Sequence, residues 1–106
     1  MPFASAYADQ EPTRDTVDAL PGRTVLEFGA PWCGHCIAAQ RLLESALAAR
    51  DDVRHLKVED GSGRPLGRSY RVKLWPTLVF LRDGEEVARL VRPTDGDDIA
   101  RALASL

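Results

Sequence analysis

In residues 23–50, an apolar run is followed by a long stretch compatible with a helix, and the sequence PWCGHC joins the two. The run RTVLEFGA has one charged residue in its interior, Glu27, and predicts a buried strand. Between Gly34 and Arg50 there is no Gly or Pro, and small or apolar side chains recur at helical spacing. These side chains belong to Cys36, Ala39, Leu43, Ala46 and Leu47. The sequence therefore predicts a strand that runs into an amphipathic helix, with two cysteines at the junction.

Turn signals divide the rest of the chain into shorter elements. Residues 13–20 predict a short helix that ends at Pro21-Gly22. The segment VRHLKVE, residues 53–59, predicts a second strand, and residues 61–72 predict a glycine-broken loop with at most a short helix.

A hairpin and a closing helix are predicted in the last third of the chain. The apolar runs 77–82 and 85–91 flank Asp83-Gly84, a pair suited to a two-residue type I′ turn. Thr94 to Asp97 resembles a capping box. The apolar face of the helix that follows is formed by Ile99, Ala102, Leu103 and Leu106.

Length and charge narrow the classes of function. A chain of 106 residues with a formal charge of −2 predicts one compact domain. Its charges are interleaved, so we expect no nucleic acid and no membrane surface as a partner. The start MPFASAYADQEPTRD has no signal-peptide pattern, and no stretch approaches the roughly 18 apolar residues needed to cross a bilayer. We expect a soluble, cytoplasmic monomer.

The spacing of Cys33 and Cys36 leaves three interpretations: a structural clip, a metal site with His35, and a reactive dithiol. A bridge across so short a loop removes little entropy from the unfolded chain, which argues against a clip. A closed zinc site normally needs four ligands, and the other histidine, His55, lies in the middle of a predicted strand. A helix start favours a thiolate, so the reactive dithiol is the leading hypothesis.

The two cysteines then receive different roles. Cys33 lies at the first helical turn, where free N–H groups favour an anion, and we predict that it is the nucleophile. Cys36 lies on the buried stripe and would resolve the mixed disulfide. His35 can carry a positive charge beside Cys33 and would favour its thiolate, unless it points to solvent and stays neutral.

Four features in order make the chain resemble the thioredoxin superfamily. They are Trp-Cys-x-x-Cys at a strand-to-helix junction, a carboxylate six residues earlier, the aromatic-Pro-Thr of WPT at 75–77, and the hairpin with a Gly turn. The wording APWCGHC resembles protein disulfide isomerase domains. Two departures are Arg41, where the family usually has a proline, and Ile37, where it commonly has a basic residue.

The resemblance implies an α/β thioredoxin fold with a central mixed sheet of four to five strands flanked by helices. We assign residues 13–106 to this domain and residues 1–12 to a flexible arm, with a short edge strand near Phe3–Tyr7 as an alternative. It also implies that Glu27 accepts the proton of Cys36 and that Lys57, on the neighbouring strand, partners Glu27. The alternatives are that Glu27 reaches an edge and that Lys57 is solvated.

The resemblance further implies a substrate-binding surface around the sulfurs. Pro76 would follow a cis peptide bond and face the disulfide, and Trp75 would offer main-chain groups to an extended partner segment. Trp32 and Trp75 would form an apolar rim unless they belong to the core. An arginine in this region would swing toward Cys36, although a plain surface role is an alternative for Arg92. The predicted binding residues are Trp32, Gly34, Trp75, Pro76 and Arg92.

The leading interpretation is therefore a thiol–disulfide oxidoreductase that needs no bound cofactor. It would reduce, form or shuffle disulfides in protein or peptide substrates and would be recycled by a redox partner. The alternative is a protein-binding module on the same scaffold, with incidental redox activity.

Overall fold

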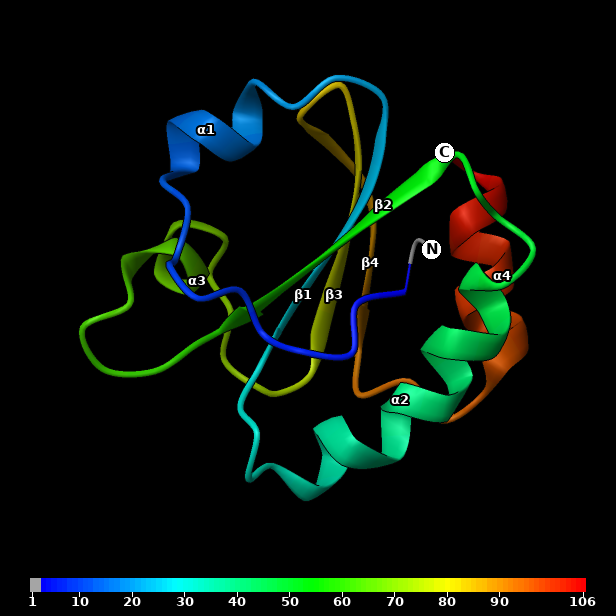
Figure 1. Cartoon of the computed structure of the whole chain (residues 1–106), viewed down its shortest axis with the longest axis horizontal. Helices are drawn as coiled ribbons and strands as arrows, with labels where there is room; N and C mark the ends of the chain where they lie inside the picture. Colours follow the sequence, from blue (N-terminus) through cyan, green and yellow to red (C-terminus); the bar gives the residue numbers. More distant parts are fainter. Residues whose placement is uncertain (1–2) are drawn as a thin grey trace.

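The computed structural model describes residues 3–106 as a mixed four-stranded sheet with helices on both faces (Figure 1). The elements in chain order are α1 (Arg14–Asp18), β1 (Arg23–Gly29), α2 (Gly34–Leu47), β2 (Val53–Glu59), α3 (Pro65–Ser69), β3 (Thr77–Arg82), β4 (Glu85–Val91) and α4 (Gly96–Ala104). The strand order is β2-β1-β3-β4, with β1 and β2 parallel and the other two pairs antiparallel. The predicted fold class is confirmed.

Alternation along β1 divides the core into two layers. Val25 packs with Leu43 of α2 and Ile99 of α4 on one face of the sheet. Leu26 and Phe28 point to the other face, where α1 and α3 cover them. Because side chains alternate along a strand, Glu27 shares the face of Val25 and lies beneath α2.

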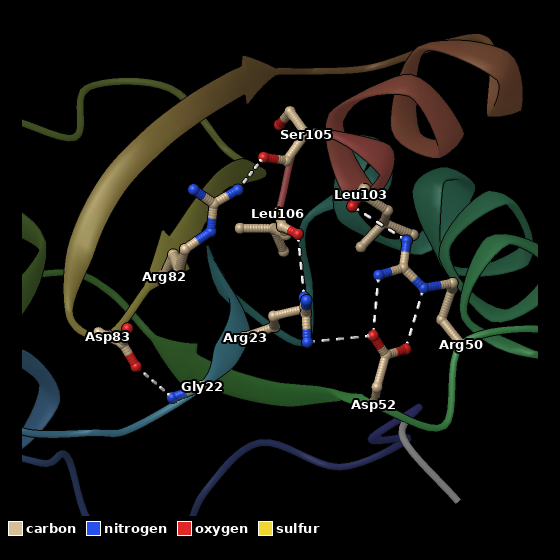
Figure 2. A network of polar contacts seen from close by, with 9 residues as sticks. All are labelled: Gly22, Arg23, Arg50, Asp52, Arg82, Asp83, Leu103, Ser105 and Leu106. Carbon is tan, nitrogen blue, oxygen red and sulfur yellow. Dashed lines mark hydrogen bonds and ion pairs between the residues drawn. The ribbon is translucent and has the colours of Figure 1, made fainter.

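Three arginines bind the last carbonyl groups of the chain (Figure 2). The bonds join Arg23 to Leu106 O at 2.9 Å, Arg50 to Leu103 O at 3.0 Å, and Arg82 to Ser105 O. Asp52 pairs with both Arg23 and Arg50, at 3.6 Å and 3.0 Å. Helix C-terminal carbonyl groups lack partners within the helix, so these cations satisfy them and fix α4 to the sheet.

The hairpin turn between β3 and β4 has the predicted type I′ geometry. Asp83 and Gly84 have φ of 51° and 83°, as both central residues of this turn require. The Asp83 carboxylate accepts from the Gly22 N–H at 2.7 Å. A Cβ at position 84 would lie 1.9 Å from Asp18 O, so only glycine fits there.

Helix α3 ends in a Schellman motif that has arginine at the position where glycine is usual. Val72 N–H donates to Gly67 O at 2.9 Å, and Arg71 N–H donates to Arg68 O at 3.0 Å. Arg71 has a left-handed φ of 58°. This conformation is energetically unfavourable for any L-residue that has a side chain.

Two sequence predictions about local structure are wrong. No strand forms near Phe3–Tyr7, because this segment bonds to side chains of β2: Ala4 N–H donates to His55 Nδ1, and Lys57 Nζ donates to Ser5 O. The next residue, Ala8, makes one backbone bond to β2, from its N–H to Lys57 O at 2.8 Å. The N-cap of α4 is Asp95, whose carboxylate accepts from Asp97 N–H, and not Thr94.

Helix α2 continues unbroken through Arg41. Within residues 3–106, no helix is long and apolar enough to cross a membrane.

Candidate active site

The two sulfurs lie where β1 gives way to α2. Cys33 is the N-cap of α2 with extended backbone angles, and its sulfur accepts a hydrogen bond from Cys36 N–H at 3.3 Å. The Cys33 residue is 8% exposed, whereas Cys36 is 1% exposed. The N–H group of Cys36, in the first turn of α2, therefore points at the Cys33 sulfur, and the Cys36 side chain lies on the buried face of the helix.

Burial governs the ionisation of Cys36. Loss of solvent, followed by the neighbouring Cys33 side chain and the charge of Glu27, raises the pKa of Cys36 to about 12. A thiol with this pKa is almost entirely protonated at neutral pH. Cys36 therefore needs a proton acceptor, or a group that stabilises its anion, before it can attack.

Glu27 is fully buried and accepts two hydrogen bonds. Gln40 Nε2 donates to Glu27 Oε2, and His55 Nε2 lies at Glu27 Oε1, each at 2.8 Å. The side chains of Glu27 and His55 are both inaccessible to solvent, so the alternative that Glu27 reaches an edge is wrong. Gln40 also donates to Cys36 O at 2.8 Å, which ties the carboxylate to the helical turn that holds the resolving thiol.

The N-terminal arm fixes the tautomer of His55. The N–H of Ala4 donates to His55 Nδ1 at 2.8 Å, so Nδ1 carries no proton. The ring proton is then on Nε2 and is donated to Glu27 Oε1. His55 therefore acts as a neutral donor to the buried carboxylate.

Lys57 lies opposite Glu27 in the β1–β2 register but does not pair with it directly. Its ammonium donates to Gln40 Oε1 at 2.8 Å and to Ser5 O at 3.3 Å. This geometry corrects the expected Glu27–Lys57 pair, because Gln40 occupies the space between the two charged groups. The alternative of a solvated lysine is also wrong, since Lys57 is 6% exposed.

The arm also brings Tyr7 to the resolving cysteine. Its ring lies 4.5 Å from Lys57 Nζ. Tyr7 and Lys57 line a cavity of about 50 Å³ together with Cys36 and Gln40. Sequence reasoning missed the roles of His55, Gln40 and Tyr7. His55 shares the face of Lys57 on β2, and Gln40 is four residues after Cys36, but no local pattern points to Tyr7.

An aromatic rim surrounds the Cys33 sulfur. Trp32 is 73% exposed, and its ring meets the ring of Trp75 edge-on, with centroids 5.5 Å apart. The indole of Trp75 donates to Asp60 at 2.9 Å. Both tryptophans lie next to the motif and neither is fully buried, so the alternative that they belong to the core is wrong. The Trp75–Pro76 peptide bond is cis, as the resemblance implied.

Arg92 contacts the site at a different atom from the one expected. Its Nε donates to Trp75 O at 2.9 Å, and the Cys33 sulfur lies 4.0 Å from the same oxygen. The expected contact with Cys36 is therefore replaced by one beside Cys33. Gly34 is open on the side where a Cβ would lie, and His35 is exposed at the start of α2.

No group of three metal-ligating side chains occurs within residues 3–106. His55, the second histidine, is held by Glu27 and Ala4 rather than facing the cysteines.

Comparisons with known proteins agree with this geometry. The family model described as Thioredoxin matches residues 7–105. The chain is 34% identical over 82 residues to Thioredoxin H2-1 of Oryza sativa subsp. japonica, which covers 77% of this chain and 59% of that protein. It is 37% identical over 84 residues to a thioredoxin of Chlamydia trachomatis, which covers 78% of this chain and 81% of that protein.

Among solved structures, thioredoxin 2 from Pseudomonas aeruginosa in its reduced form superposes with a TM-score of 0.84. The two chains are 56% identical, and the match covers 93% of this chain and 92% of that one. The similarity thus includes the strand-to-helix junction that carries the cysteines.

Proposed function

The chain belongs to the thioredoxin family of thiol–disulfide oxidoreductases, and on that premise we propose that its CGHC dithiol reduces disulfides in protein substrates by mixed-disulfide exchange. The observation that carries this proposal is the asymmetry of the two thiols. Cys33 caps a helix N-terminus, and Cys36 lies buried beneath it with its pKa raised to about 12. Disulfide exchange requires an attacking thiolate and a second thiol that stays protected until the mixed disulfide forms.

In the first step, the Cys33 thiolate attacks one sulfur of a substrate disulfide. A bond forms between Cys33 and that sulfur, and the other substrate sulfur leaves as a thiolate that takes a proton from solvent. The N–H groups of the first turn of α2, including that of Cys36, stabilise the Cys33 thiolate before it attacks. The product is a mixed disulfide between the protein and its substrate.

In the second step, Cys36 loses its proton and attacks the Cys33 sulfur. We assign the proton to Glu27, because it is the buried carboxylate whose charge acts on Cys36. The Cys33–Cys36 disulfide forms, and the second substrate sulfur leaves as a thiolate that is protonated by solvent. The two electrons of the dithiol have then passed to the substrate, and a redox partner must return two electrons for another cycle.

An apolar surface around Cys33 suits an extended segment of a protein substrate. Trp32, Ile37 and Leu74 are 73%, 61% and 49% exposed. The carbonyl group of Trp75 lies beside the Cys33 sulfur, where a substrate N–H could bind it as in strand addition. Arg92 holds this carbonyl group in the free protein, so a bound segment would share or displace the guanidinium.

Insulin reduction tests the proposal. In the presence of dithiothreitol, substoichiometric amounts of the protein should accelerate precipitation of the insulin B chain. Cys33→Ser should abolish the acceleration. In a separate reaction without dithiothreitol, reduced Cys36→Ser should accumulate a mixed disulfide with insulin that intact-mass spectrometry detects. A protein that binds insulin without accelerating its reduction would instead be a binding module, and the proposal would be wrong.

A further inference from the structure

We propose that Tyr7 is a further catalytic residue, whose phenol O–H donates a hydrogen bond to the Cys36 sulfur and stabilises its thiolate while it resolves the mixed disulfide. This inference rests on the proposed function, because it assigns Cys36 the resolving step. It concerns a residue outside the C-x-x-C motif and outside every helix and strand of the fold.

The geometry around Gly29 brings the two groups together. A Cβ built on Gly29 would lie 2.6 Å from the Cys36 sulfur and 3.1 Å from the Tyr7 hydroxyl. The Cys36 sulfur and the Tyr7 hydroxyl therefore both lie close to Gly29 at the end of β1, and a side chain at position 29 would clash with the sulfur. Tyr7 and Cys36 also line the same small cavity.

The arm holds Tyr7 in place from both sides. Before Tyr7, the Ala4 N–H binds His55 Nδ1, and after it, the Ala8 N–H binds Lys57 O, each at 2.8 Å. Both anchors are on β2, and the arm passes beside this strand in Figure 1. The Tyr7 ring is half-buried and packs against the Lys57 ammonium, and Tyr7 lines the cavity next to Cys36.

The charges around the phenol keep it a donor. Burial, followed by the charges of Cys36, Glu27 and Cys33, raises the pKa of Tyr7 well above its ordinary value. The nearby cation, Lys57, lies over the ring face rather than at the hydroxyl. Tyr7 therefore keeps its proton throughout the working pH range and does not take the proton of Cys36.

The chemical step balances with Glu27 as the proton acceptor. The proton of Cys36 passes to Glu27, the Cys36–Cys33 bond forms, and the bond between Cys33 and the substrate breaks. Tyr7 gains and loses no proton; it donates a hydrogen bond to the sulfur while that sulfur is negative. Hydrogen bonds to charged groups are about twice as strong as neutral ones, so the benefit is concentrated in this step.

The substitution Tyr7→Phe removes the hydroxyl and keeps the ring against Lys57. Tyr70→Phe is a matched control, because the Tyr70 hydroxyl is buried without a hydrogen-bond partner in the described chain and packs with Phe28 on the other face of the sheet. Single-turnover reactions of the reduced proteins with insulin, quenched in acid and analysed by intact mass, give the rates of formation and decay of the mixed disulfide separately.

We expect Tyr7→Phe to form the mixed disulfide within about twofold of the wild-type rate and to resolve it about 10- to 100-fold more slowly. Tyr70→Phe should match the wild type in both steps. Equal resolution rates for Tyr7→Phe and wild type, or equal slowing of formation and decay, would overturn the role of Tyr7. A wild-type protein that never forms the mixed disulfide would instead refute the proposed function itself.

Discussion

Replacing Glu27 by Gln tests whether the buried carboxylate drives resolution. Glu27 accepts hydrogen bonds from both Gln40 and His55, and it is a fully buried carboxylate whose charge raises the pKa of the resolving thiol. Glutamine fills the same space but cannot accept the Cys36 proton. The first attack, by Cys33, does not need Glu27 and should stay within about twofold of the wild-type rate.

The magnitude follows from the ionisation of Cys36. With a pKa near 12, the thiol is ionised in about one molecule in 10⁵ at pH 7. Without its base, the variant depends on this small fraction, so decay of the mixed disulfide should slow by about 10²- to 10⁴-fold. The decay rate should then rise roughly tenfold per pH unit from about pH 7 to pH 10, because the thiolate fraction does. The wild-type profile should be flatter.

Rapid acid quench and intact-mass analysis measure the decay directly. Glu44→Gln, the same chemical change on the exposed side of α2, is the control and should decay like the wild type. In Glu27→Gln, the new N–H₂ group faces one of the two donors, Gln40 or His55, and this contact could disturb the fold. Near-UV circular dichroism therefore checks that the variant is folded. A folded Glu27→Gln protein with wild-type decay would show that Glu27 is structural and that another group takes the proton.

Three further predictions concern stability and redox potential. Arg71→Gly should raise the free energy of unfolding by about 1 kcal/mol, because glycine adopts the left-handed φ of 58° without strain. The melting temperature should then rise by about 4–8 °C, and an unchanged melting temperature would contradict this reasoning. Burial raises the pKa of Cys36 from 9.0 to about 12, so the unfolded state ionises first and the reduced protein should lose stability as the pH rises from about 9 to about 12. Urea unfolding under reductant should show this loss in the wild type and not in Cys36→Ser. His35→Pro removes the side chain that we predict favours the Cys33 thiolate. Equilibration with glutathione should give this variant a potential lower by roughly 20 mV, and equal potentials would show that His35 does not tune the dithiol.

Much of the fold follows from local sequence patterns. The buried strand, the helix after PWCGHC and the type I′ turn at Asp83-Gly84 depend on periodicity and on residues with special backbone freedom. These properties act over a few residues, so the sequence determines them without knowledge of distant contacts. The sequence alone does not decide the N-cap of α4, because Thr94 and Asp95 are both suitable caps and the choice depends on how the chain leaves β4.

The positions of the two cysteines were also determined by sequence. A helix start after a strand predicts which thiol is nearer the surface, and the structure gives 8% exposure for Cys33 and 1% for Cys36. The sequence also predicts that Glu27 needs a partner, because a charged side chain in an apolar strand is buried. The identity of the partner did not follow, because it depends on which side chains fill the space beneath α2.

Only the tertiary structure decided the network around Glu27 and Cys36. Gln40 separates Lys57 from Glu27, and Ala4 fixes the tautomer of His55 by a contact across 51 positions of the chain. Tyr7 reaches Cys36 from an arm without regular secondary structure, where no periodicity indicates a direction. Whether a hydrogen bond forms depends on differences of a few tenths of an ångström in the separation of donor and acceptor. For side chains far apart in sequence, the packing of the whole chain sets this separation.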